Sequence, residues 1–482
     1  MTRLLLWYRR DLRWHDHEPL AQAIARNAEI LPLYCFDPRE FSQTPFGFPK
    51  TGAFRAQFLR EAVTDLRQQW QRRGSNLVLR WGKPEAVIPE LADRYRVDAV
   101  YAHGEVTAEE TRVEGKLRQA LGTIPLELYW GATLIHRDDL PFAIPELPDL
   151  FTHFRKAVEK NWLIRRQDPT PDTLSPLPPD FDPGELPTWA QLGLTPPRPD
   201  DRAVLNFQGG ETAGQERLND YFWRRDRLRL YKETRNGMLG ADYSSKFSPW
   251  LALGCLSPRL IYEQVQAYEA ERIANNSTYW LIFELLWRDY FRFVALKARN
   301  ALFKPGGIRG IPIPWQQDES RFERWCRGET GYPLVDANLQ ELAATGFMSN
   351  RGRQNVASFL TKNLGIDWRK GAAWFESLLI DYDVCSNYGN WNYTAGVGND
   401  ARGFRYFNIV KQAKDYDPQG DYVKHWLPVL AAIPPHRVHE PWKLNPEEQQ
   451  RYGLRLGVDY PRAIVDFFAS VKKNQAVYEA AL

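Results

Sequence analysis

The sequence of 482 residues has little of what marks several large protein classes. Its four cysteines, Cys35, Cys255, Cys326 and Cys385, lie far apart, without a Cys-x-x-Cys pair or a histidine at metal-ligand spacing. This pattern argues against a disulfide framework and against a structural zinc site. No apolar run reaches the roughly 18 residues that a membrane span needs, and the N-terminal apolar run is too short for a signal peptide. We therefore expect a soluble protein of the reducing cytoplasm that does not enter a membrane.

The sequence also lacks a strong excess of charge of either sign. It has 63 Lys and Arg against 60 Asp and Glu, a net charge of +3. A protein that binds nucleic acid through its overall charge is excluded, so any basic surface must be local. Aromatic residues are abundant by contrast, with 18 Trp, 22 Tyr and 25 Phe. Since aliphatic side chains fill a core without polar atoms to satisfy, this excess suggests a chemical use for some of the aromatic rings.

The first part of the chain alternates short apolar runs with helical patterns. The runs predict strands at 4–8, 30–36, 77–81, 98–102 and 124–129, and the patterns predict helices at 19–27, 53–73, 84–95 and 108–121. This alternation predicts a doubly wound α/β domain with a parallel sheet over residues 1–135. The first predicted strand is followed by "RRDLRWHDH" rather than G-x-G-x-x-G, which argues against a dinucleotide site of the NAD type.

The rest of the chain changes character twice. Residues 136–201 are expected to connect two domains, because 168–200 hold ten prolines and favour an extended chain. From 202 to 482 long helical patterns such as 277–298 and 353–364 predominate, without a convincing strand. A chain of this length exceeds what one hydrophobic core usually serves. We therefore predict a second, all-α domain over residues 202–482.

The stretch "ADYSSKFSPW", residues 241–250, gathers hydroxyl groups and Lys246 ahead of an apolar run with helical character. Hydroxyls and free backbone N–H groups at a helix start, with a lysine beside them, form an anion site. The alternative is a helix cap with nothing bound. The sequence of this stretch taken alone is more typical of the cap.

A charged stripe crosses the apolar segment "YWLIFELLWRDYFRF", residues 279–293. Glu284, Arg288 and Arg292 are spaced four residues apart on one helical face, with Trp287 beside them. The stripe is either a buried structural ion pair or a surface that faces a polar ligand.

Two further segments carry polar groups suited to binding. "TGFMSNRGRQNVASF", residues 345–359, places Asn350, Arg351 and Arg353 in one turn, where guanidinium groups can hold phosphate or carboxylate; alone, it is more typical of a solvated turn. The segment "LIDYDVCSNYGNWNYTAGVGND", residues 379–400, has Asp381 and Asp383 but neither histidine ligands nor a nucleophile. Hydrogen bonding to a heteroaromatic ring is the better use for its carboxylates and amides.

Together these segments closely resemble the photolyase/cryptochrome family of flavoproteins. The resemblance spans nearly the whole chain and rests on "WYRRDLRWHDHEPL", "DYSSKFS", "ELLWRDYFR", "GYPLVDANLQELAATGFMSNRGRQNVASF" and "DYDVCSNYGNWNYTAG". The stretch "YKETRNGMLGADYSSKFSPWLALGCLSPR" looks most like the cryptochrome DASH subgroup. The resemblance implies that the helical domain binds FAD.

The resemblance also implies which residues hold the cofactor. They are Tyr231, Ser244, Ser245, Lys246, Phe247 and Ser248 around the phosphates, with Arg288, Arg353, Asp381, Asp383 and Asn387. Arg353 would pair with Asp381 beside the flavin ring, and Asp383 would meet the ribityl or adenine side. Asn387 would lie against flavin N5 as a neutral amide, which favours the anionic hydroquinone and a repair-type flavin. Glu105 matches the family's antenna-binding glutamate, for which methenyltetrahydrofolate is the expected antenna and a solvated loop glutamate the alternative.

Trp391, Trp368 and Trp315 fall on the family's electron-transfer chain, although each taken singly is more typical of a core residue. In a repair enzyme of this family Glu284 would bind the damaged bases and Trp287 would stack on them. The side chains that would hold flanking phosphates or the pocket edge are Arg235, Asn350, Arg351 and Arg405. Tyr393 stands where double-strand photolyases usually have a second tryptophan. Its smaller ring makes extraction of a lesion from a duplex harder, which favours single-stranded substrate.

The sequence therefore predicts a monomeric blue-light or near-ultraviolet flavoprotein that repairs cyclobutane pyrimidine dimers in single-stranded or looped DNA. The alternative is a non-enzymatic photoreceptor or DNA-binding transcriptional regulator that uses the same flavin. Signalling relatives often carry long disordered C-terminal extensions, and "VKKNQAVYEAAL" is not one. An α/β nucleotide-binding protein with unrelated helices would leave the match of the helical segments unexplained.

Overall fold

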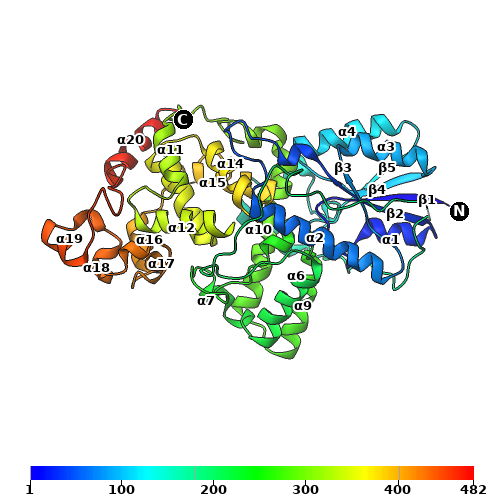
Figure 1. The fold of residues 1–482 in the computed structure, drawn as a ribbon, viewed down its shortest axis with the longest axis horizontal. Coiled ribbons are helices and arrows are strands. Elements are labelled where there is room, and N and C mark those ends of the chain that lie inside the picture. The colour runs from blue at the N-terminus through cyan, green and yellow to red at the C-terminus, as the bar shows by residue number, and fades with distance from the viewer. Residues whose placement is uncertain (1, 179, 401) are drawn as a thin grey trace.

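A computed structural model describes residues 2–178, 180–400 and 402–482, and shows a sheet-containing part followed by a helical part (Figure 1). The strands are β1 (Arg3–Tyr8), β2 (Glu29–Phe36), β3 (Val78–Trp81), β4 (Ala99–His103) and β5 (Leu126–Tyr129). They form one parallel sheet in the order β3-β2-β1-β4-β5. The predicted strands are confirmed, with ends displaced by no more than two residues.

Helices cover both faces of this sheet (Figure 1). They are α1 (Glu18–Ala25), α2 (Ala53–Arg72), α3 (Pro84–Arg94) and α4 (Ala108–Leu121), as predicted. Leu4 and Leu6 of β1 belong to the core that includes α1 and α2, whereas Leu5 and Trp7 pack with α3 and α4. Because successive side chains of a strand point to opposite faces, a strand buried on both faces must be apolar throughout. The doubly wound α/β fold is confirmed.

The strand order reverses between β1 and β4, where open α/β sheets usually bind a ligand. Here the segment 9–17 fills that place and joins the sheet to the helical part. The Asp16 carboxylate lies 2.6 Å from the Arg259 guanidinium, and the Leu12 amide donates to the Leu253 carbonyl at 3.0 Å. We call residues 9–17 the interdomain latch.

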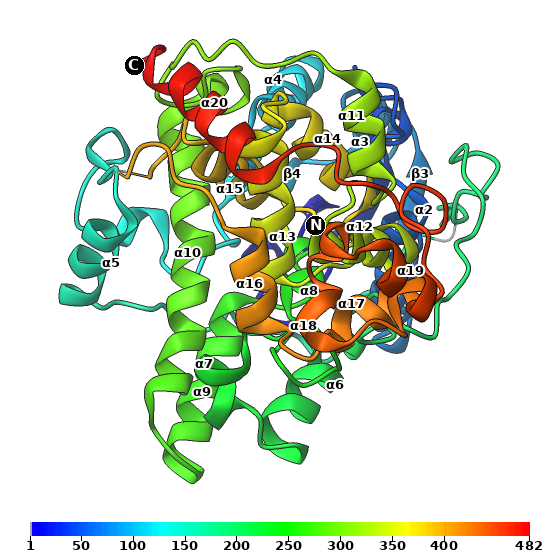
Figure 2. The same ribbon diagram turned by 90° about the vertical axis from the view of Figure 1, so that its left-hand side faces the viewer.

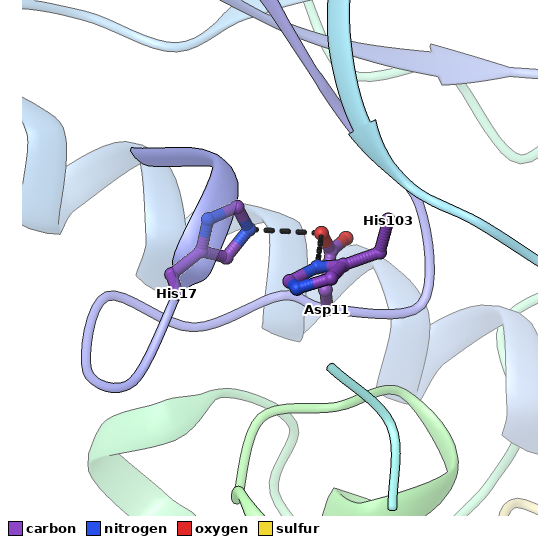
Figure 3. Close-up of side chains that lie close together, drawn as sticks. All are labelled: Asp11, His17 and His103. Carbon is purple, nitrogen blue, oxygen red and sulfur yellow. Dashed lines mark hydrogen bonds and ion pairs between the residues drawn. The ribbon is translucent and has the colours of Figure 1, made fainter. Parts of the chain in front are cut away.

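Within the latch, Asp11 meets two histidines (Figure 3). One oxygen of Asp11 lies 2.8 Å from Nε2 of His17 and 2.7 Å from Nδ1 of His103. Nδ1 of His17 accepts a hydrogen bond from the Leu20 amide, so the proton of this ring is on Nε2 and is donated to Asp11. Burial lowers the pKa of His103 to about 4 and keeps it neutral. Both separations are hydrogen-bond lengths, so Asp11 links the two histidines as a hydrogen-bonded clamp.

In the described residues of the connector, 136–178 and 180–201, two 3₁₀ turns, Arg137–Asp139 and Ile144–Glu146, precede a single α-helix, α5 (Phe151–Lys160), which lies beside α10 (Figure 2). In residues 168–178 and 180–200 the structure has no helix or strand, as the proline content predicts. The Pro183 carbonyl accepts a hydrogen bond from the Leu79 amide at 2.8 Å. The proline-rich segment thereby covers the β3 edge of the sheet.

The remaining residues form the all-α domain, in whose described residues no strand occurs. Its helices are α6 (Glu211–Asn219), α7 (Tyr231–Thr234), α8 (Ser248–Ala252), α9 (Pro258–Glu271), α10 (Asn276–Ala298), α11 (Glu319–Cys326), α12 (Pro333–Thr345), α13 (Asn350–Ser358), α14 (Trp368–Leu378), α15 (Val384–Ala395), α16 (Ile409–Tyr416), α17 (Asp421–Trp426), α18 (Pro435–Val438), α19 (Pro446–Tyr452) and α20 (Phe467–Glu479). Among the described helices, none combines the length and apolar character that crossing a bilayer requires.

The two long helical patterns differ in how closely they were predicted. The pattern at 277–298 is confirmed as α10, which begins at a capping box formed by Asn275 and Thr278. For the pattern at 353–364, the observed helix α13 begins three residues before the predicted start. The Ser349 hydroxyl accepts a hydrogen bond from the Gly352 amide and thereby caps the helix at this earlier position. The last part of the pattern, Phe359–Asn363, is a π-helical turn.

Candidate functional site

A cavity of about 520 Å³ opens in the helical domain, between α7, α10, α13 and α15. Every residue that the sequence analysis assigned to the cofactor phosphates, the flavin ring or the lesion lines it. These are Tyr231, Arg235, Ser244, Ser245, Lys246, Phe247, Ser248, Glu284, Trp287, Arg288, Asn350, Arg351, Arg353, Asp381, Asp383, Asn387, Tyr393 and Arg405, and Trp391 joins them. Glu105, Trp368 and Trp315 lie outside the cavity wall.

One end of the cavity is formed by the loop 241–247. The Arg217 side chain of α6, which the sequence analysis missed, holds this loop from behind. Its Nε donates to the Ser245 carbonyl at 3.1 Å, and its Nη2 donates to the carbonyls of Ala241 at 2.8 Å and Ser244 at 3.2 Å. These bonds fix the loop from outside the cavity. No local pattern around Arg217 announces this role, because its partners lie more than twenty residues away.

Lys246 is the residue of this loop that most needs a ligand. It is 3% exposed, its φ is +56°, and its Nζ has no hydrogen-bond partner among the described residues. The ammonium lies 3.1 Å from the centre of the Tyr243 ring, and burial lowers the pKa of Lys246 well below its usual range. A buried cation without a partner is costly, so this end of the cavity suits an anion such as a diphosphate.

The anion site does not depend on a helix cap. Helix α8 has five residues, and Phe247 at its N-cap makes no side-chain capping bond. The structure therefore does not show the side-chain cap that the alternative supposes.

The middle of the cavity carries a paired guanidinium and carboxylate. Nη2 of Arg353 lies 2.7 Å from Oδ2 of Asp381, which confirms the predicted pair. Oδ1 of Asp381 is buried and has no hydrogen-bond partner in the described part of the chain. An unsatisfied buried acceptor in a cavity wall fits the N–H or O–H donors of a bound ring or sugar.

Helix α15 presents three of the predicted residues to the same cavity. Asp383 is its N-cap and accepts a hydrogen bond from the Ser386 amide at 2.7 Å. Burial alone would raise the pKa of Asp383, but Arg288 and Arg292 hold it below its usual range. Asn387 and Trp391, one turn apart, share a face of the helix. The Asn387 amide donates to the Ala372 carbonyl at 3.1 Å, which fixes its orientation.

The charged stripe of α10 divides between ligand-facing and structural roles. Glu284 lines the cavity and lies 2.7 Å from Arg235. Arg288 also lines it and donates to the carbonyls of Leu251 and Ala132. These two members of the stripe therefore line the cavity, and a contact with a polar ligand stays a prediction for them.

Arg292, the third member of the stripe, forms a buried ion pair with Glu105 at 2.8 Å that joins the two domains. The Glu105 side chain is 7% exposed, so the alternative of a solvated loop glutamate is wrong. Its role toward an antenna stays a prediction.

Aromatic side chains surround the mouth of the cavity. The Trp287 ring lies 6.1 Å from the Tyr393 ring at an angle of 83°, and the Tyr393 hydroxyl accepts a hydrogen bond from Arg402. Burial raises the pKa of Glu284 even though Arg235 lies beside it. A carboxyl that holds its proton more readily can donate to a carbonyl oxygen of a bound base.

The predicted phosphate-binding residues at the mouth differ in how firmly their side chains are held by other residues. Asn350 and Arg405 are exposed. Arg351 is held by Asn236 at 3.0 Å and lies 4.4 Å from the Tyr416 ring. Arg351 is therefore positioned before any ligand binds, whereas Asn350 and Arg405 can move toward one.

The three predicted electron-transfer tryptophans lead from the cavity outward. Trp391 lines the cavity, Trp368 is fully buried and Trp315 is half-buried. The indole N–H groups of Trp368 and Trp315 donate to the same Pro305 carbonyl, at 3.0 and 3.1 Å, so these two rings are neighbours. A Cβ atom at Gly371, one turn after Trp368, would collide with the Trp391 ring. This glycine lets Trp391 approach α14, the helix that begins with Trp368.

Comparisons with known proteins agree with this arrangement. Residues 4–176 match the family model described as DNA photolyase, and residues 280–480 match the FAD binding domain of DNA photolyase. A Cryptochrome DASH of Gloeobacter violaceus is 64% identical over 480 residues, covering 99% of this chain and 96% of that one. The crystal structure of a Synechocystis sp. PCC6803 cryptochrome has 57% identity and a TM-score of 0.96, with 99% of both chains covered. That of a bacterial class III photolyase from Agrobacterium tumefaciens has 28% identity and a TM-score of 0.88, covering 100% and 98%.

Proposed function

The chain belongs to the photolyase/cryptochrome family, within its cryptochrome DASH subgroup, and on this premise we propose that it repairs cyclobutane pyrimidine dimers in single-stranded or looped DNA. The observation that carries the proposal is a single cavity that joins two kinds of site. Its inner part has the Lys246 and Arg353–Asp381 features of a cofactor site, and its mouth has Glu284 and Trp287. Lesion and cofactor would thus meet without an intervening wall.

The unpaired Lys246 and the free oxygen of Asp381 fit the diphosphate and the ring of FAD. Reduced FAD bound there would supply light-driven electron transfer to the lesion. The chain's own part is to hold the two together and to exclude water. Asn387, whose amide N–H is already used by the Ala372 carbonyl, would offer its oxygen to the ring.

At the mouth, Glu284 would hydrogen-bond the damaged bases and Trp287 would cover them. Burial raises the pKa of Glu284, so its carboxyl takes up a proton more readily, and a protonated Glu284 would donate to a pyrimidine carbonyl and stabilise charge that develops there. Arg235 would remain close enough to stabilise the same negative charge. The pair therefore fits a substrate that becomes negatively charged during the reaction.

The preference for single-stranded substrate is inferred from the size of the second aromatic residue at the mouth, Tyr393. Removing a dimer from a duplex costs a few kcal/mol of unstacking, which tight aromatic contacts must offset. Tyr393 offers less area than tryptophan, and its hydroxyl is engaged by Arg402. Single-stranded or looped DNA avoids much of that cost.

A second candidate function is supported by the tryptophans alone. The route from Trp391 through Trp368 to Trp315 would photoreduce a flavin whether or not DNA is repaired. A photoreceptor or transcriptional regulator would need this route but not Glu284. Relatives of this chain are named cryptochromes, which supports this second candidate.

The remaining proposals concern the setting of the protein. All four cysteines are free, which fits the cytoplasm, although the Arabidopsis thaliana relative is named chloroplastic/mitochondrial. A monomer and a methenyltetrahydrofolate antenna at Glu105 are proposed from the family resemblance.

Replacing Glu284 by alanine distinguishes the two functions. In a lyase, E284A should lower the rate of dimer repair about 100-fold, the usual effect of removing one stabilising donor, with flavin photoreduction unchanged. The control is E323A, which removes an exposed glutamate of α11. No repair by the wild type with normal photoreduction would refute the lyase assignment, whereas repair by E284A at the wild-type rate would refute the role of Glu284 in it.

A further inference from the structure

The connector between the domains does more than join them. Its helix α5 lies beside α10, and Phe151 at the start of α5 stacks on Trp287 of α10. The ring centres are 3.7 Å apart and the planes differ by 13°. Phe151 is 6% exposed and lies outside the cavity wall, so it contacts Trp287 from behind.

Other aromatic rings hold Phe151 in place. Its ring meets Phe283 edge-on at 5.1 Å and Tyr290 at 5.7 Å, both on α10. Tyr393 meets Trp287 edge-on at the mouth. The indole is thus fixed between a flat ring behind it and an edge beside it, a geometry favoured by the quadrupoles of the rings.

The residue two positions earlier, Asp149, ties the same turn to α10 and to the segment that follows α15. The Asp149 carbonyl accepts hydrogen bonds from the Tyr290 hydroxyl at 2.6 Å and from the Asn399 amide at 2.8 Å. The Asp149 carboxylate lies 2.8 Å from the Lys297 ammonium. Residues 149–151 of the connector therefore contact α10 and the segment that follows α15 at one place.

We propose that Phe151 is a positioning residue of the lesion site, which holds the Trp287 indole in the orientation needed to stack on a pyrimidine dimer. The inference rests on the proposed function, since it needs Trp287 to receive the lesion. Phe151 acts through Trp287 and touches neither lesion nor cofactor. Pre-ordering a ring lowers the entropy lost when the lesion binds, so Phe151 contributes to affinity without contact.

The test measures dark binding of a single-stranded oligothymidylate with and without one thymine dimer. F151A should weaken binding of the damaged strand about threefold to tenfold, the range of an aromatic pair, and leave the undamaged strand unaffected. W287A should weaken it further, and the F151A/W287A double variant should equal W287A, because the effect passes through the indole. F151L serves as a second variant if F151A folds poorly.

The control is F142A, which removes a half-buried ring of the connector that meets Phe154 and not Trp287. It should bind both strands as the wild type does. Flavin photoreduction should be unchanged in all variants. Equal affinity of F151A and wild type, additive effects in the double variant, or equal weakening of the undamaged strand would each overturn the proposal.

Failure of the proposed function gives a different result. The wild type would then not distinguish the two strands, and the positioning of Trp287 is read from ¹⁹F spectra of protein with 5-fluorotryptophan. The Trp287 resonance, assigned with W287F, should shift or broaden in F151A and not in F142A. An unchanged resonance would overturn the role of Phe151 whatever the substrate.

Discussion

At the scale of single residues, the site is recognisable by what its side chains leave unsatisfied. Lys246 and Asp381 present buried polar atoms without partners to one cavity. Lys246 also has a positive φ, a backbone conformation that is unfavourable for any residue that carries a side chain. Such costs persist where function requires them. Both atoms become satisfied when a diphosphate and a ring with hydrogen-bond donors enter.

Lys246 makes FAD binding depend on pH. In the free cavity the pKa of Lys246 lies well below the usual range, and a bound diphosphate would raise it, so binding takes up a proton. Affinity should be greatest below the free-cavity pKa and fall as pH rises toward the usual lysine range. Arg217, Glu341 and Asp242 are the other charged groups that act on this amine.

Two variants check this prediction in titrations of apoprotein with FAD at several pH values. K246M should weaken binding about 10-fold to 100-fold, the range for a lost hydrogen bond to a charged group. K246R keeps its proton throughout and should lose the pH dependence. E341Q is the control for the neighbouring acid and should keep it. A K246R protein with the wild-type slope would contradict the account.

Tyr393 should set the preference for single strands. Y393W adds ring area at the mouth and should raise repair of a dimer in duplex relative to single strand, by about threefold to tenfold. The control is Y393F, which removes only the hydroxyl and should keep the single-strand preference. Equal strand preferences of Y393W and wild type would show that another feature sets the substrate.

At the scale of elements, local patterns predicted the sheet and α10 well and short elements poorly. The strands are apolar throughout because both faces are covered, so their runs stand out in the sequence. Helix α8 stops at Ala252, before Gly254, whose φ is +66°. Helix α5 was missed because its order comes from packing against α10, which no local pattern records.

We expect the three tryptophans, which lie on α14, α15 and the loop before α11, to act together as one electron-transfer route. W368F removes the fully buried middle ring and should slow flavin photoreduction at least tenfold, while repair by chemically reduced protein stays normal. The comparison uses W70F, which replaces an equally buried ring of α2 in the other domain. If W368F and W70F photoreduce at the same rate, the electrons take another path.

The site residues were predicted because the family motifs name them, and the structure brings all of them except Glu105, Trp368 and Trp315 to one cavity. Their supports were not predictable. Arg217 holds the loop 241–247, Arg292 pairs with Glu105, and Phe151 stacks on Trp287, each across a long stretch of sequence. Such contacts depend on tertiary packing, and no periodicity in the chain encodes them.

At the scale of the whole molecule, a contact between the two domains occupies the place where an open α/β sheet usually binds a ligand. The interdomain latch places Asp16 against Arg259, and Asp11 clamps His17 and His103 where the strand order reverses. This place is filled by protein, and the cavity that we assign to FAD is lined by residues of the helical domain. The sheet domain supports that site through the Glu105–Arg292 pair.

Breaking the latch should loosen the whole protein. D16A leaves the buried Arg259 guanidinium without one of its two carboxylates and should lower the free energy of unfolding by about 3–5 kcal/mol, the range for a broken buried pair. The control R165A breaks a more exposed pair with Asp139 and should cost about 1 kcal/mol or less. Both free energies of unfolding are measured by denaturant titration, with the release of FAD as the signal. Equal losses would show that the latch is not a principal domain contact.

The most direct test of the central claim measures thymine dimers in single-stranded oligothymidylate after illumination with the purified protein carrying reduced FAD. The account predicts loss of dimers that depends on blue or near-ultraviolet light, with little loss in the dark and much less in duplex. Flavin photoreduction with no loss of dimers from either substrate would contradict the claim and support the photoreceptor.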